Sequence, residues 1–104
     1  MQGIAEQQLK GIEVKSLPRA YTDLAWARHQ SGEINDSLWS IQEAITQIEH
    51  DADSFYVWFR AGQIYETAGL TRQAILAYQI CLEKRPYHTI ARDAIERLSN
   101  TIQE

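Results

Sequence analysis

The sequence predicts an all-α fold, a short α-solenoid of two helical hairpins with a flanking N-terminal helix and a C-terminal capping helix. Two observations lead to this prediction. The chain is similar to itself at an offset of 37 residues, and in each copy apolar residues recur at helical spacing on both sides of a glycine. With 104 residues the chain is long enough for one domain and too short for two, so we expect a single domain over 1–104.

The offset of 37 residues keeps the size of the side chain at most aligned positions. The aligned pairs are Tyr21 with Trp58, Leu24 with Ala61, Ala25 with Gly62, Gly32 with Gly69, Ser37 with Ala74, Ile41 with Tyr78, Ala44 with Cys81 and Ile45 with Leu82. Because a fixed internal period is the signature of repeat proteins, we assign a first repeat to 18–54 and a second to 55–87.

The first predicted element is a flanking helix over 3–14, where Ile4, Ala5, Leu9 and Ile12 stand at helical spacing. Gly3 and Gly11 each cost such a helix about 1 kcal/mol relative to alanine, so we expect it to need a neighbour.

The two repeats then predict four helices, at 18–31, 35–49, 54–67 and 71–84. Gly32 and Gly69 stand where the first helix of each pair has to end in a left-handed conformation, which glycine adopts without penalty. A polar linker, HDADS at 50–54, separates the repeats, and Pro86 ends the fourth helix.

The last predicted element is the capping helix at 88–103, which has one apolar and one polar side. Its apolar stripe consists of Ala91, Ala94, Ile95, Leu98 and Ile102, and the opposite side carries Arg92, Asp93, Glu96 and Arg97. A terminal helix with one solvated side is typical of the caps that close repeat arrays.

The stretch 58–86 resembles the tetratricopeptide repeat (TPR), whose pattern is W-x2-L-G-x2-Y, then A-x3-F, then P. At these spacings the chain has Trp58, Ala61, Gly62, Tyr65, Ala74, Tyr78 and Pro86, with Ala61 for Leu and Tyr78 for Phe. The match is strongest over 55–88. The copy at 18–54 is degenerate, since Arg28 replaces the Tyr and Glu49 stands in place of the Pro. Small residues such as Gly62 and Ala74 would let two antiparallel helices approach, with the aromatic rings packed around them.

The resemblance implies that the first helix of each pair lines a concave groove that receives a segment of a partner protein. Residues beside the core stripe recur at the same offset of 37 and would stack into one surface. These predicted groove residues are Arg19, Thr22, Trp26, His29, Tyr56, Phe59, Gln63 and Glu66. Aromatic side chains beside polar ones favour binding hot spots. The alternative is that the chain's own flanking helices cover these aromatics.

The second helix of each pair is apolar on a further side, through Trp39 in the first repeat and Leu76 with Ile80 in the second. This pattern suggests a second contact on the convex face, by self-association as a homo-oligomer or by docking to a longer parent protein. Scattered surface apolar residues are the alternative. The overall expectation is a scaffold or adaptor that binds another protein or peptide, with a structural or self-association module as the alternative.

Several other functions find little support in the sequence. His29, His50 and His88 lack partners at metal-ligand spacing, so neither a metal nor another cofactor is expected. Asp51 and Asp53 begin like a calcium loop, but its turn glycine is missing. Cys81 stands on the inner stripe as a small buried hydrophobe, and no nucleophile with an adjacent base is evident, so the chain is not expected to be an enzyme.

The net charge and the cysteine content restrict which partners and which cellular compartment are expected for the protein. The net charge is −4 and no long basic run occurs, so nucleic acid is not an expected partner. No run of eighteen apolar residues exists, which argues against a membrane span. A single cysteine and the lack of a signal peptide pattern fit the reducing cytoplasm.

Overall fold

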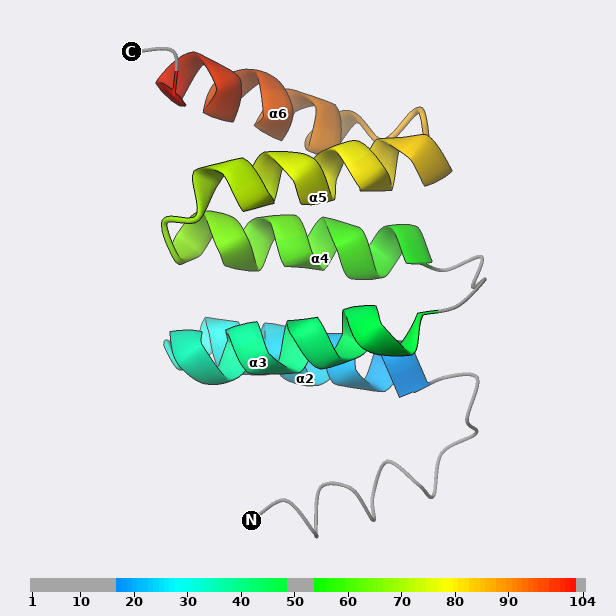
Figure 1. Cartoon of the computed structure of the whole chain (residues 1–104), viewed down its shortest axis with the longest axis vertical. Coiled ribbons are helices and arrows are strands. Elements are labelled where there is room, and N and C mark those ends of the chain that lie inside the picture. Colours follow the sequence, from blue (N-terminus) through cyan, green and yellow to red (C-terminus); the bar gives the residue numbers. More distant parts are fainter. Residues whose placement is uncertain (1–16, 49–53, 103–104) are drawn as a thin grey trace, which may run out of the picture.

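The computed structural model of the chain describes residues 17–48 and 54–102, which form five α-helices and, within these ranges, no strand. The helices are α2 (Leu17–Gln30), α3 (Ile34–Gln47), α4 (Ser54–Thr67), α5 (Thr71–Lys84) and α6 (Thr89–Ile102). Helix α2 packs against α3, α4 packs against α5, and α6 packs on α5; along the long axis the pair α2 and α3 is followed by α4, α5 and α6 (Figure 1). The prediction of an all-α fold is confirmed.

The predicted helix boundaries agree closely with the structure. Helices α4 and α5 have the predicted limits, and the others differ by one or two residues at an end. The largest difference is at the end of α3, where Ile48 is extended with ψ 127° and its N–H bonds the carbonyl of Ile45. The helix therefore ends at Gln47 and not at 49. The predicted flanking helix at 3–14 lies outside the described residues, as does the linker up to residue 53.

The two tight turns of the structure repeat each other in detail. Gly32 and Gly69 have φ of 81° and 79°, the left-handed region predicted for them. In the first turn the N–H of Gly32 bonds the carbonyl of His29 and that of Glu33 bonds Arg28. The second turn makes the same bonds from Gly69 to Glu66 and from Leu70 to Tyr65. Both turns are Schellman motifs, which satisfy the last carbonyls of a helix.

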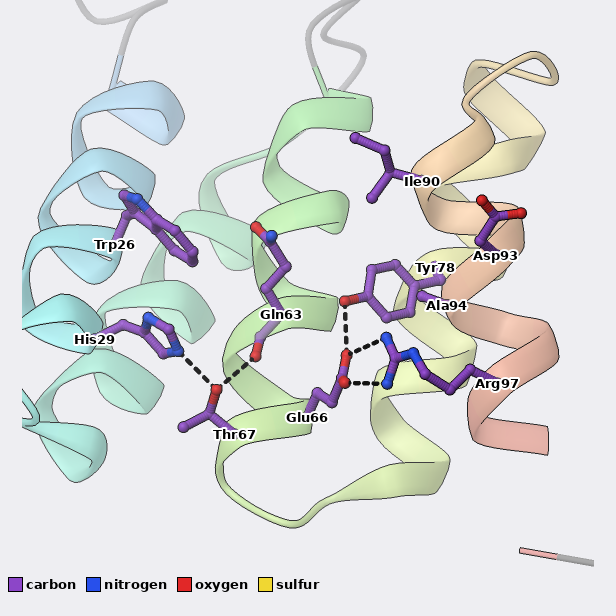
Figure 2. A pocket seen from close by; sticks show the side chains of 10 residues that line it. All are labelled: Trp26, His29, Gln63, Glu66, Thr67, Tyr78, Ile90, Asp93, Ala94 and Arg97. Atoms are coloured by element: carbon purple, nitrogen blue, oxygen red, sulfur yellow. Dashed lines mark hydrogen bonds and ion pairs between the residues drawn. The ribbon is translucent and has the colours of Figure 1, made fainter. Parts of the chain in front are cut away.

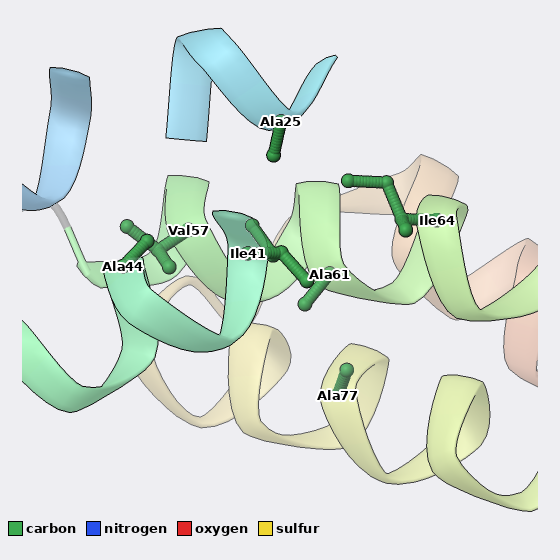
Figure 3. Packing of buried hydrophobic residues seen from close by; sticks show 7 residues of the cluster. All are labelled: Ala25, Ile41, Ala44, Val57, Ala61, Ile64 and Ala77. Carbon is green, nitrogen blue, oxygen red and sulfur yellow. The ribbon is translucent and has the colours of Figure 1, made fainter. Parts of the chain in front are cut away.

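The buried apolar residues form two clusters along the stack. The first cluster joins α2, α3, α4 and α5 and contains Ala25, Ile41, Ala44, Val57, Ala61, Ile64 and Ala77 (Figure 3). The second joins α5 and α6 through Ala74, Tyr78, Cys81, Ala91, Ala94 and Leu98. Alanine is frequent in both clusters because small side chains let neighbouring helices lie close together.

The closest approach in the second hairpin is between Gly62 on α4 and Tyr78 on α5. A Cβ atom at position 62 would lie 2.6 Å from the Tyr78 ring, well inside van der Waals contact. The ring is itself buried, with 2% of its residue surface exposed. The predicted small residue at 62 is therefore required by one aromatic ring that lies against the α4 backbone.

The link between α5 and α6 follows from Pro86 and His88. Arg85, the residue before Pro86, has left the helical conformation, with φ −138° and ψ 84°, and α5 ends there, as steric contact with a proline ring favours. In the structure His88 Nδ1 accepts the N–H of Ala91 at 3.2 Å and so caps the start of α6. Its ring lies 4.5 Å from that of Phe59, which ties this link to α4.

The predicted apolar stripe of α6 is buried at Ala91, Ala94 and Leu98 and half-buried at Ile95. Arg92, Asp93, Glu96 and Arg97 lie on the exposed side, as expected for a cap. None of the five described helices is long and apolar enough to cross a membrane.

Replacing Gly62 by alanine is expected to destabilise the fold, because the new methyl group would overlap the Tyr78 ring. Overpacking typically costs about 1–3 kcal/mol, and the better helix propensity of alanine returns about 1 kcal/mol, so a net loss of up to roughly 2 kcal/mol is predicted. Urea denaturation followed by circular dichroism measures this change.

The same substitution in a Tyr78→Leu background should be neutral or stabilising, since the ring that causes the overlap is gone and only the propensity gain remains. Equal losses in the two backgrounds would show that the Gly62–Tyr78 contact is not the cause.

Candidate functional site

The candidate site is a pocket of about 420 Å³ between α2, α4 and α6 (Figure 2). It is lined by Trp26, His29, Gln63, Glu66, Thr67, Tyr78, Ile90, Asp93, Ala94 and Arg97. Four of the predicted groove residues are among them: Trp26 and His29 from α2, and Gln63 and Glu66 from α4. The structure thus brings half of the predicted surface together at one pocket and adds a third wall from α6.

The Trp26 side of the pocket is built by stacking. The His29 ring lies 4.7 Å from the Trp26 ring and is tilted from it by 14°. The Arg60 guanidinium lies 3.8 Å from the centre of the Trp26 ring and donates a hydrogen bond of 2.8 Å to Gln63 Oε1. A cation over an aromatic face stabilises both groups, so these side chains hold each other in place before any ligand binds.

His29 is oriented by a short chain of hydrogen bonds across to α4. Its Nε2 lies 2.7 Å from Thr67 Oγ1, and the Thr67 hydroxyl donates to the carbonyl of Gln63 at 3.2 Å. Thr67 has a single hydroxyl proton, so the tautomer of His29 decides which of the two groups donates between Nε2 and Oγ1. His29 Nδ1 is buried and has no hydrogen-bond partner among the described residues. The atom is therefore closed off from the pocket and is not a contact for a ligand.

The opposite end of the pocket is closed by a carboxylate that binds two other helices. Glu66 on α4 accepts a hydrogen bond of 3.1 Å from the Tyr78 hydroxyl and pairs with both Nη atoms of Arg97, with Nη2 at 3.4 Å from Oε1. Burial, followed by the charge of Glu66, raises the pKa of Tyr78 far above its ordinary value. The hydroxyl therefore remains a donor at neutral pH, and Glu66 is used inside the fold and is not a free contact for a partner.

The remaining predicted groove residues lie apart from this pocket. The Arg19 guanidinium lies over the Tyr56 ring at 3.9 Å, and the Tyr56 hydroxyl donates to Asp23 at 2.8 Å. Phe59 packs between Tyr78 and His88, with ring centres 6.2 and 4.5 Å away. The charged and aromatic groups of the surface therefore cover one another in part.

The prediction that Thr22 lies on the groove surface is wrong. Thr22 is fully buried, and its hydroxyl donates to the carbonyl of Pro18 at 2.7 Å. A threonine inside a helix satisfies its hydroxyl by bonding one turn back, which lets it be buried like an apolar residue. Helical spacing alone predicted that Thr22 lies beside the core and not within it.

The α6 wall of the pocket is not among the predicted groove residues. Asp93 and Arg97 are predicted only as part of the polar side of the cap, and Ile90 has no predicted role, although at an offset of 34 residues these three align with the groove positions Tyr56, Phe59 and Gln63. This alignment is the feature of the sequence from which the α6 wall could have been predicted. Ile90 is 62% exposed, which is unusual for an isoleucine on a helix that already buries one face.

The predicted convex-face residues lie on α3 and α5, away from the residues of this pocket. Trp39 is 46% and Leu76 56% exposed, whereas Ile80 is half-buried. Beside Leu76 is a second pocket of about 390 Å³, lined by Gln42, Ile45, Thr46, Trp58, Tyr65, Gln73, Leu76 and Ala77. The hydroxyl group of Tyr65 has a raised pKa because the ring is buried against this pocket, and a hydrogen bond with Gln42 opposes the shift.

Among the described residues, no three histidine, cysteine or acidic side chains converge as they would around a metal ion. His50, Asp51 and Asp53 lie outside those residues. Cys81 is fully buried in the second cluster, as its place on the inner stripe predicted, and burial raises the pKa of its thiol to about 11. The groups that reach the candidate pocket can accept and donate hydrogen bonds and stack on flat or apolar groups.

Comparison with protein-family models, with curated proteins and with solved structures finds no match to this chain.

The pairing of Glu66 with Arg97 is expected to hold α6 against α4. In Arg97→Met the charge is lost and the apolar stem is kept, so the amides of α6 should exchange with solvent up to roughly fivefold faster, equivalent to less than about 1 kcal/mol for a pair this exposed. Hydrogen exchange measured by NMR tests this. Glu96→Gln, on the exposed side of the same helix, is the matched control and should leave the rates unchanged.

Cys81 is expected to react slowly in the native protein, because only the thiolate is nucleophilic and burial keeps the thiol protonated well above neutral pH. Ellman's reagent should modify it at the rate of global unfolding at neutral pH and much faster in urea. Rapid modification under native conditions would contradict the buried placement.

Proposed function

We propose that this chain is a protein-binding module, a scaffold or adaptor, that holds a segment of a partner protein against the surface formed by α2, α4 and α6. The proposal includes a fold of the TPR type, a short α-solenoid in which these three helices are the first helices of successive units. The cytoplasm is the proposed compartment.

The observation that carries the proposal is the pocket itself. Its main walls come from α2, α4 and α6, which are separated along the chain by one helix each, and its lining mixes aromatic, amide, hydroxyl, carboxylate and aliphatic groups. Such a mixture suits a peptide, which presents backbone donors and acceptors together with apolar side chains. The identical Schellman turns at Gly32 and Gly69 support the repeat character of the fold.

The groups available to a partner differ from those first predicted. Glu66 is engaged by Tyr78 and Arg97 and His29 Nδ1 is buried, whereas Ile90 and Asp93 are exposed on α6. A partner segment would therefore place an apolar side chain on Ile90 and a hydrogen-bond donor or a cation near Asp93. Because the surface is small and has a polar rim, micromolar affinity is expected, about −8 kcal/mol.

Peptide selection followed by calorimetry tests the proposal. Peptides displayed on phage are selected on the immobilised chain, and the affinity of the selected peptides is then measured by isothermal titration for the native chain and for Ile90→Lys. The substitution should weaken binding at least roughly tenfold, because it replaces an exposed apolar anchor in the pocket by a charge.

Tyr87→Lys is the matched control, since Tyr87 is 90% exposed near the same helix and does not line the pocket. Its affinity should equal that of the native chain. Peptides that bind both variants as tightly as the native chain, or that shift no NMR signals of Trp26, Ile90 and Asp93, would show that the pocket is not the binding site.

A further inference from the structure

We propose that residues 3–14 of this chain dock as a helix on the outer face of α2, antiparallel to it, and so extend the stack by half a unit. The outer face of α2 consists of Leu17, Ala20, Leu24 and Ala27, which helical spacing places on one side of the helix. The proposal does not depend on the function assigned to the pocket, because Trp26 and His29 lie on the other side of α2.

The outer face of α2 is apolar but is not part of the core. Leu17, Ala20 and Leu24 are only half-buried, and Ala27 is exposed. Within the described ranges, none of these four residues belongs to the two buried clusters or packs against them. In Figure 1 α2 and α3 form one end of the stack of described helices. Helices α3 to α6 therefore leave this apolar face incompletely covered.

The internal repeat shows what covers the same face one unit later. At the offset of 37 residues the outer face of α2 aligns with four residues of α4 that are at most 2% exposed, namely Ser54, Val57, Ala61 and Ile64. The last three share a buried cluster with residues of α2 and α3, the helices that precede α4. Equivalent positions of a repeat array contact the preceding unit, so the outer face of α2 is expected to contact the segment that precedes α2.

The segment 3–14 meets this requirement by its position and by its own need for a contact. It is separated from Leu17 by two residues, and links of two to five residues join antiparallel helices. A segment tethered this closely has an effective concentration of about millimolar, so it occupies the face before a separate, more dilute molecule does. Because it is short and contains Gly3 and Gly11, it is not expected to be a stable helix alone in water.

The sizes of the side chains fit an antiparallel contact between the segment and α2. In two antiparallel helices, a step forward along one helix matches an equal step back along the other. When the contact residues nearest the link lie at one level, a large side chain faces a small one at each of the next two levels, which lets the side chains interdigitate. The pairs are Ile12 with Leu17, Leu9 with Ala20, and Ala5 with Leu24.

Methyl NOE spectroscopy of the native full chain tests the proposal. Cross-peaks are expected between the methyl groups of Leu9 and Ala20 and between those of Ala5 and Leu24, because each pair faces the other in the contact. In a mixture of isotope-labelled and unlabelled chain, isotope-filtered spectra should show none of these cross-peaks between chains. An absence of cross-peaks between residues 3–14 and α2 would overturn the proposal, and so would cross-peaks between chains, which would place a second copy on the face.

Two matched substitutions show whether the docked segment stabilises α2. Leu9→Asp places a carboxylate in the predicted contact, so the amides of α2 should exchange with solvent at least roughly tenfold faster, whereas those of α6 should keep their rates. Gln7→Asp introduces the same side chain on the opposite side of the segment and should leave the rates in α2 unchanged. Equal effects of the two substitutions on α2 would contradict the predicted contact.

Discussion

The contact between the Tyr78 ring and the backbone at Gly62 is the constraint on which the rest of this structure depends. It brings α5 so close to α4 that no side chain fits at position 62. The same tyrosine then extends its hydroxyl to Glu66, and Glu66 binds Arg97 on α6. Tyr78 therefore links α4, α5 and α6. Its packing against Gly62 positions the wall of the candidate pocket that Tyr78, Glu66 and Arg97 form.

These contacts explain why the side chains of the candidate site hold one another in place and why many of its polar groups are already bonded within the chain. Arg60 lies over Trp26, Arg19 lies over Tyr56, and Glu66 is bound by Arg97, so much of the polar capacity of the surface is used within the chain. Side chains held in this way lose little further entropy when a ligand binds. The cost is that fewer groups remain for a partner, and those that do remain lie mainly on α6.

The two faces of the stack differ in what they leave exposed. The face of α2, α4 and α6 has exposed polar groups around Ile90, whereas the face of α3 and α5 exposes Trp39 and Leu76 around an apolar pocket.

The sequence by itself determined the five helices of the described residues, the two left-handed glycines and the core stripes, because these follow from local spacing, from backbone sterics and from the need to bury apolar residues. It also placed Gly62 at a close contact and Cys81 in the core. It did not place Thr22, whose hydroxyl is satisfied within its own helix, and it did not find the α6 wall of the pocket. Only the tertiary structure decided those points, since the pairing of Glu66 with Tyr78 and Arg97 joins residues 12 and 31 positions apart. Helical spacing shows which face of a helix a residue occupies, but not which side chain of another helix meets it there.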